Sequence, residues 1–221
     1  MELLRNIVAT ALIFFYNLTG DYGLAIILLT LVVRLVTLPL SMKQMASTKA
    51  MQDLAPERKK LEEKYKNDKE KLNKETMELY KLHKVNPLGG CLPLLIQFPV
   101  LISIFAVLRN PDIMIDAIPG FSPLFLGLID LNVPDMLAPF IPGAIPLLAG
   151  LTTYVQTKQS TAGQPAAGGM GAMTVMMPFM IVFFSFNLPA GLPLYWLVGN
   201  VFSIGQHYIL TRPKPAPEGG V

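Results

Sequence analysis

Five apolar segments constrain this chain more than any other feature, because each is long enough, or nearly so, to cross a bilayer core as a helix of about 20 residues. They cover residues 21–40, 88–108, 138–156, 173–189 and 191–210. Only 15% of the residues are charged, whereas soluble domains carry about 25%. The sequence therefore predicts an all-α integral membrane protein with five transmembrane helices.

The amino end, residues 1–20, is apolar at helical spacing but makes a poor signal peptide. Glu2 offsets Arg5, and no clear small-residue cleavage site follows the apolar stretch. We expect an amphipathic helix that lies in the membrane interface. A sixth transmembrane span is the alternative.

Basic residues predict the orientation, because short cytoplasmic segments collect Lys and Arg. Twelve of the 18 basic residues lie between Lys43 and Lys84, whereas residues 110–140 contain four Asp and no Lys or Arg. We therefore expect the segment 41–87 in the cytoplasm and the loop 109–137 outside. The flexible loop 157–172 and the tail 211–221 also carry basic residues and would be cytoplasmic. The amino end would then lie outside and the carboxyl end inside.

The charged segment 41–87 reads as a helical hairpin. Its two predicted helices, residues 41–66 and 69–84, meet at Asn67-Asp68 and carry opposite charges four residues apart, which supports helices. Pro56 marks a kink or a fresh helix start. The hairpin is either a solvated structural loop or an electrostatic contact surface for lipid headgroups, ribosomal RNA or a partner protein.

Arg34 is the most informative single residue, because it lies about two thirds of the way along the first apolar segment. An arginine inside a bilayer costs about 2.5–3.5 kcal/mol on insertion scales and is expected to face protein or water. Snorkelling to the inner headgroups is one way to meet that cost. Apart from Asp21, the first residue of the first segment, none of the five segments contains Asp or Glu. The sequence therefore predicts a wet cavity and a transient anionic partner from outside the chain.

Further polar side chains in the apolar segments are candidates to line such a cavity. They are Gln97, Thr152, Thr153, Gln156, Ser185, Asn187, Asn200, Ser203 and Gln206. Trp196, Asn200 and Ser203 share one helix face by their spacing of four and three residues. Each of these polar residues alone could instead join neighbouring membrane helices by hydrogen bonds. Together with Arg34 they predict a polar groove.

Residues for catalysis or metal binding are scarce. The chain has one cysteine, Cys91, and two histidines, His83 and His207, without ligand spacing. The apolar segments hold no paired aspartates, and the H-E-x-x-H motif is absent. We therefore expect no enzyme activity, no cofactor and no metal. A small channel or transporter with an intramembrane arginine is the main alternative, although five spans without inverted halves suit alternating access poorly.

Several runs together resemble the YidC/Oxa/Alb family of membrane protein insertases, in its short bacterial form. The runs are TLVVRLVTLPLSMKQMASTKAMQDLAPE, NPLGGCLPLLIQFPVLISIFAVL, LLAGLTTYVQ and MPFMIVFFSFNLPAGLPLYWLVGNVFSIGQHYIL. The resemblance covers residues 21–210. It implies an insertase and chaperone with a hydrophilic groove open to cytoplasm and lipid. Arg34 would attract acidic residues of a substrate, and Gln97, Gln156 and Trp196 would line the groove.

The resemblance also implies partners and a location. Nascent membrane proteins with short acidic translocated tails would be the substrates, inserted with or without the Sec translocon. The lipid bilayer would be the immediate environment, with the ribosome and the Sec translocon as further candidate partners and no DNA. The location would be the bacterial cell membrane.

Overall fold

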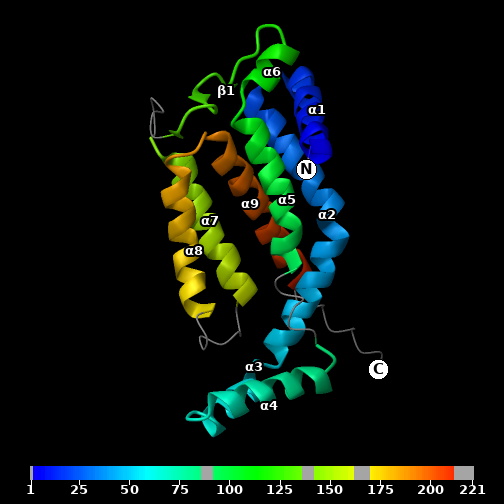
Figure 1. The fold of residues 1–221 in the computed structure, drawn as a ribbon, viewed down its shortest axis with the longest axis vertical. Helices are drawn as coiled ribbons and strands as arrows, with labels where there is room; N and C mark the ends of the chain where they lie inside the picture. The colour runs from blue at the N-terminus through cyan, green and yellow to red at the C-terminus, as the bar shows by residue number, and fades with distance from the viewer. Residues whose placement is uncertain (1, 86–91, 136–141, 162–169, 212–221) are drawn as a thin grey trace, which may run out of the picture.

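The computed structural model describes residues 2–85, 92–135, 142–161 and 170–211, most of them helical (Figure 1). A two-stranded antiparallel sheet is the exception, with Leu124 opposite Asp130 and Phe125 opposite Ile129. The elements in chain order are α1 (Glu2–Thr19), α2 (Tyr22–Asp53), α3 (Ala55–Lys64), α4 (Lys69–Leu82), α5 (Leu92–Leu108), α6 (Asp112–Ala117), β1 (Leu124–Phe125), β2 (Ile129–Asp130), α7 (Ala144–Thr161), α8 (Met170–Ser185) and α9 (Gly191–Thr211).

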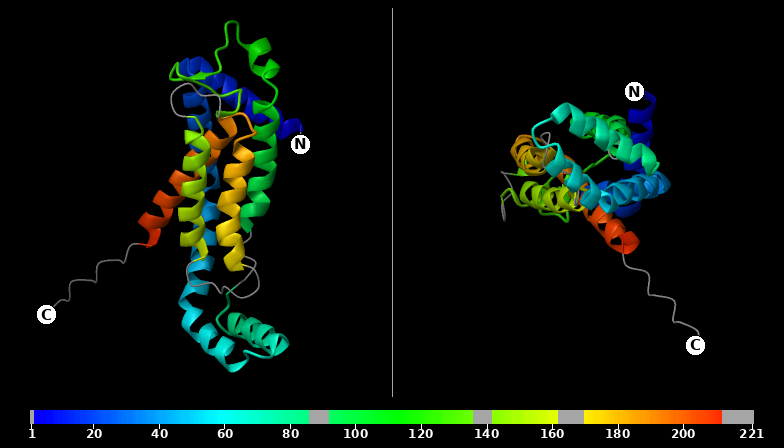
Figure 2. Two further views of the ribbon diagram at one scale, coloured as in Figure 1. Left: turned by 90° about the vertical axis from the view of Figure 1, so that its left-hand side faces the viewer. Right: turned by 90° about the horizontal axis from the view of Figure 1, so that it is seen from below.

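The long helices form a bundle in which α9 is central. It packs against α2, α5 and α7, while α7 also packs against α8, and α1 lies against α2 and α5. The helices α3 and α4 project beyond one end of the bundle, and α6 and the sheet cover the other (Figures 1 and 2). We call these the hairpin end and the loop end.

Helix α2 begins at Asp21, whose Oδ1 accepts a hydrogen bond from the Leu24 amide at 2.9 Å and so caps the helix. The helix continues through Pro39 to Asp53. The predicted boundary between a span and a hairpin at residue 40 is therefore not a break in the backbone. The next helix starts at Ala55, with Pro56 in its first turn, where the missing proline N–H costs no helical hydrogen bond.

The hairpin is built from the end of α2 together with α3 and α4. Asp68 caps α4 by accepting a hydrogen bond from the Lys71 amide at 3.0 Å. A small apolar core formed by Met51, Leu54 and Tyr80 joins the three helices. The hairpin therefore has tertiary packing of its own.

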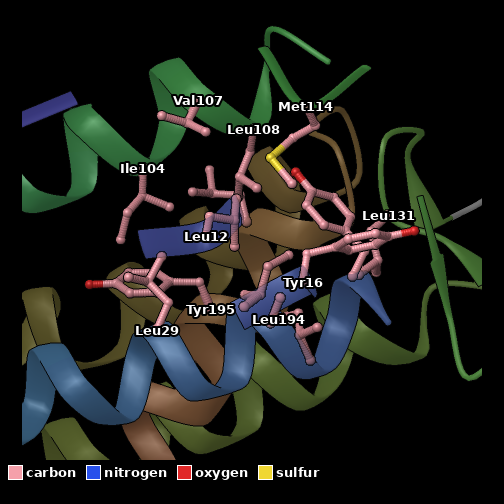
Figure 3. Packing of buried hydrophobic residues seen from close by; sticks show 14 of the residues in the cluster. Leu12, Tyr16, Leu29, Ile104, Val107, Leu108, Met114, Leu131, Leu194 and Tyr195 are labelled. Carbon is pink, nitrogen blue, oxygen red and sulfur yellow. The ribbon is translucent and has the colours of Figure 1, made fainter. Parts of the chain in front are cut away.

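The main core lies at the loop end of the bundle (Figure 3). Its buried side chains come from α1, α2, α5, α6, α7, α9 and the loop that contains Leu131. Tyr16, Tyr22 and Phe121 pack ring against ring with centroid separations of 5.0 to 6.5 Å. Asp21 ties the loop to α2, because its Oδ2 accepts a hydrogen bond from the Leu126 amide at 2.6 Å.

The loop that follows β2, residues 131–135, also forms hydrogen bonds with the starts of α9 and α7. The amides of Ala190 and Gly191 donate to the carbonyls of Val133 and Leu131 at 2.9 and 3.0 Å. Asp135 is buried, and its Oδ2 accepts a hydrogen bond from the Ile145 amide at 3.0 Å. The described part of the predicted outer loop 109–137, residues 109–135, is thus a folded cap over the bundle.

Among the described residues, α2 is the one helix whose length and composition suffice to cross a membrane. Shorter apolar helices occupy Gln97–Leu108 and Met176–Ser185. The starts of two predicted spans, at residues 88 and 138, lie outside the described residues, as do half of the loop 157–172 and nearly all of the tail 211–221. Five spans therefore stay a prediction.

Helix α1 has one buried face and one exposed apolar face. Val8, Leu12 and Tyr16 are buried in the main core. Leu3 and Leu18 are 76% and 68% exposed. The exposed face is compatible with the predicted interfacial helix, whose depth in a membrane stays a prediction.

Candidate functional site

On four helices the buried interior of the bundle stops short of the hairpin end. Among the residues whose burial the structure describes, the last buried ones before the hairpin are Thr30 on α2, Ser103 on α5, Thr153 on α7 and Asn200 on α9. From Leu31 to Ala50 of α2 no residue is buried. All four residues that end the buried region are polar. The packed core thus gives way to a more open, polar region toward the hairpin end.

Arg34 lies one helical turn beyond Thr30, at the border of this open region. Its guanidinium rests against the backbone of Gly199 on α9, and a Cβ built on that glycine would lie 3.1 Å from Nε and 3.2 Å from Cζ. The Nε atom is buried and has no hydrogen-bond partner. Among the described residues, no carboxylate lies within 4.0 Å of the guanidinium nitrogens. The positive charge is therefore not neutralised by any described part of the chain.

Tyr195 brings Arg34 and Gln97 together. The Gln97 Nε2 on α5 donates a hydrogen bond to the Tyr195 hydroxyl at 2.6 Å. The same tyrosine is 1% exposed and lies one helical turn before Gly199, against which the Arg34 guanidinium rests. Polar groups of α2, α5 and α9 thus lie close together at the edge of the main core, to which Tyr195 belongs.

A second polar group joins α7 to the other flank of α9, with the Thr153 hydroxyl at its centre. This oxygen accepts hydrogen bonds from Trp196 Nε1 at 3.1 Å and from Asn200 Nδ2 at 2.7 Å, and donates to the Ala149 carbonyl at 2.7 Å. Trp196 and Asn200 therefore link helices, which is the alternative role that the sequence left open for them.

The remaining predicted residues lie nearer the hairpin end. The Ser203 hydroxyl donates to the Gly199 carbonyl of its own helix at 2.9 Å. Gln156 is half-buried on α7, one turn beyond Thr153. Gln206 on α9 has a buried Nε2 without a hydrogen-bond partner. Of the six predicted residues, Arg34 and Gln97 thus meet at Tyr195, and Trp196 and Asn200 meet at Thr153.

A pocket of about 250 Å³ opens between α2, α7 and α9 at the hairpin end. Met42, Met45 and Lys49 line it from α2, and Ser160 and His207 from the other two helices. Met45 is eleven residues after Arg34, a spacing that places both on nearly the same face of α2. The open region therefore extends from Arg34 toward the hairpin.

Two residues of the site escaped the sequence prediction. Tyr195 could have been found from its hydroxyl, which needs a partner when the ring is buried. Gly199 follows Tyr195 by one helical turn, and this spacing was the only indication in the sequence that the two residues share a helix face. Neither residue type points to a polar site by itself.

The arrangement favours binding over chemistry. Two buried donors, Arg34 Nε and Gln206 Nε2, lack acceptors, and such groups are stabilised by a ligand that supplies oxygen atoms. Within the described residues there is no group of three or more His, Cys, Asp or Glu side chains that could hold a metal ion. The site is therefore suited to bind a carboxylate or another oxygen-rich group.

Sequence comparisons identify relatives over nearly the whole chain. Residues 14–217 match the family described as 60Kd inner membrane protein. Membrane protein insertase MisCA of Bacillus subtilis is 42% identical, with 92% of this chain and 78% of that protein aligned. Membrane protein insertase YidC of Fusobacterium nucleatum is 39% identical, with 96% and 98% aligned.

A solved structure shares the fold. It is described as an active YidC insertase crystal structure with the first transmembrane domain resolved, and it superposes with a TM-score of 0.69 at 26% identity. The match covers 96% of this chain and 46% of that one, so this chain spans about half the length of the solved protein. On this evidence the chain belongs to the 60Kd inner membrane protein family, which includes the YidC membrane protein insertases.

Proposed function

We propose that this protein inserts nascent membrane proteins into the bacterial cell membrane. The helices α2, α5, α7, α8 and α9 would span the bilayer. The hairpin end would face the cytoplasm, because the segment 43–84 holds most of the basic residues. The loop end would face outside, with the amino end outside and the carboxyl end in the cytoplasm.

The observation that carries this proposal is the Arg34 guanidinium, which lies inside the bundle with a buried, unpartnered Nε and no described carboxylate beside it. A fixed positive charge in such a place is stabilised by an anion that arrives and leaves. The acidic residues of a short translocated tail would supply that anion. Gln97 would act through Tyr195, to which it donates a hydrogen bond.

The change in packing along the bundle gives the substrate a direction. A polar tail would enter from the hairpin end, where the bundle is open, and would stop below the packed core at the loop end. The polar tail would then have to cross only the part of the membrane at the level of the packed core, which is thinner than the whole bilayer. Burial of the substrate's own apolar segment in lipid would drive the last step.

The outward surface of the bundle fits contact with lipid. Met176, Phe179, Met180 and Phe183 form a shallow apolar hollow on α8. On α2, Val36 is 73% exposed. Patches of this kind on a bundle indicate a membrane or protein partner.

The charged hairpin would meet lipid headgroups, the ribosome or the Sec translocon. The activity would be transfer without covalent chemistry.

Reconstitution in proteoliposomes tests the proposal. Two versions of one small substrate, with an acidic or a neutral translocated tail, are translated beside the vesicles, and insertion is scored by protease protection. We expect Arg34→Ala to reduce insertion of the acidic version about tenfold or more, the effect of losing one desolvated charge-assisted hydrogen bond. Arg34→Lys should retain most insertion, because a point charge suffices.

Equal insertion by the wild type and Arg34→Ala would contradict the proposal, because it would remove the arginine from the mechanism. Equal loss in Arg34→Ala and Arg34→Lys would show that a point charge is not enough and that the planar guanidinium is required. An ion flux through vesicles that hold the protein without any substrate would instead favour the channel or transporter.

A further inference from the structure

The guanidinium of Arg34 occupies a notch in the surface of α9 that exists because residue 199 has no side chain. A Cβ at Gly199 would overlap Nη2 of Arg34, and it would also lie 3.1 Å from Nε and 3.2 Å from Cζ. Three atoms of the planar guanidinium therefore lie close to one backbone position. Gly199 itself is buried.

Other glycines of the described helices show that this contact is specific. On the same helix, Gly205 has nothing within 4 Å of the position that a Cβ would take. Gly150 on α7 faces the apolar Val182, so it serves helix packing. Gly191 and Gly23 also face apolar side chains, Ile26 and Phe125. Among these positions, only Gly199 faces a charged group.

Glycine inside a helix lowers helix stability relative to alanine, so its presence needs a reason. At Gly199 the reason is space for the arginine. Tyr195, one turn earlier on the same face of α9, is held by Gln97 at 2.6 Å. The guanidinium therefore lies against α9 one turn from a tyrosine that is itself held in place.

We propose that Gly199 is a positioning residue for Arg34, and that its missing side chain keeps the guanidinium against α9 in the pose that receives an acidic group of the substrate. This inference rests on the proposed function for its consequence, but the contact itself can be tested without a substrate. An alanine at position 199 would push the guanidinium away from α9. A lysine at position 34 carries no planar group and can avoid the added methyl.

The first test measures structure alone, as a double-mutant cycle of thermal unfolding in detergent. We expect Gly199→Ala to lower the unfolding temperature in the presence of Arg34 and to have no such effect, or the opposite one, in the Arg34→Ala background. Gly205→Ala is the matched control and should not depend on residue 34. If Gly199→Ala alone fails to fold, the double variant should recover folding. Equal effects of Gly199→Ala in both backgrounds would overturn the proposal.

The second test uses the insertion assay with acidic and neutral tails. Gly199→Ala should reduce insertion of the acidic version about threefold to tenfold, a usual size for coupling between contacting residues, and should leave the neutral version nearly unchanged. Adding Gly199→Ala to Arg34→Lys should cause little further loss. Equal loss for both tails, or unchanged insertion of the acidic one, would contradict a positioning role. If the wild type inserts neither version, the proposed function fails, and the stability cycle still decides the role of Gly199.

Discussion

The apolar part of α2, residues 22–40, has two halves of similar sequence that lie in opposite environments. Toward the loop end, Ile26 and Leu29 are buried against α1, α5 and α9. Toward the hairpin end, Leu35 and Val36 are 57% and 73% exposed, and it is Arg34 that faces α9. The first half is therefore apolar inside, whereas the second half places a charge inside and apolar side chains outside.

This difference shows that an apolar segment can serve two purposes. In the half near the loop end, interlocking side chains and backbone hydrogen bonds from the loop fix the helices in place. In the half near the hairpin end, apolar residues suit contact with lipid, while the inner surface is left with polar groups that lack partners. A bundle whose interior was packed along its whole length would have no space for the polar tail of a substrate.

The largest expected effect comes from weakening the packed half. Ile26→Ala removes a side chain that is 1% exposed, and truncations of this kind destabilise proteins by about 2–5 kcal/mol through the cavity that they leave. Val36→Ala on the same helix should change stability by less than about 0.5 kcal/mol, as expected for exposed positions. The measurement is the free energy of unfolding in detergent micelles. Similar losses in the two variants would remove the distinction between the halves.

A smaller effect should follow from breaking the polar group at the border between the halves. Thr153→Val removes the acceptor of Trp196 and Asn200 while keeping the shape of the side chain. Trp196 Nε1 then loses its acceptor. Asn200 Nδ2 keeps only its longer contacts with the Thr152 hydroxyl at 3.3 Å and the Ala149 carbonyl at 3.4 Å. We expect this loss to cost about 1–3 kcal/mol of stability. Ser203→Ala is the control, because that hydroxyl bonds to the backbone of its own helix. A loss for Ser203→Ala as large as for Thr153→Val would show that the link between α7 and α9 is not special.

The sequence could indicate the apolar segments, the charged hairpin and the presence of an arginine within the first apolar segment, because each depends on residues close together in the chain. It could not show that α2 continues past residue 40, because Pro39 signals a possible break and the helix tolerates it. The sequence also did not predict the folded cap at the loop end. Its short elements, α6 and the two strands, depend on distant contacts such as that between Asp21 and Leu126.

The pairing of polar residues was also beyond the sequence. Helical spacing places Trp196, Asn200 and Ser203 on one face, but it does not say which neighbour that face meets. The structure directs Trp196 and Asn200 to α7, and the adjacent face with Tyr195 and Gly199 to Arg34. A turn of about 100° between successive residues is enough to separate the two groups.

The smallest expected effect concerns the cap at the loop end. Asp21 has two roles, since one carboxylate oxygen caps α2 and the other accepts a hydrogen bond from Leu126 of the cap. Asp68 offers a matched control, because the described contacts give it only the capping role on α4. Asp21→Ala should cost about 1–2 kcal/mol, and Asp68→Ala about 1 kcal/mol.

Hydrogen exchange separates the two roles of Asp21 better than global stability does. In Asp21→Ala, amides of residues 122–131 should exchange faster, because the cap loses its tie to α2, whereas amides near Arg34 should keep their rates. Asp68→Ala should accelerate exchange only in the first turn of α4. Unchanged exchange across 122–131 in Asp21→Ala would contradict this role of Asp21. The aromatic packing of Tyr16, Tyr22 and Phe121 and the hydrogen bonds from the start of α9 would then suffice to hold the cap. The loop end would in that case owe its order to packing and backbone hydrogen bonds, in contrast to the half of the bundle that holds Arg34.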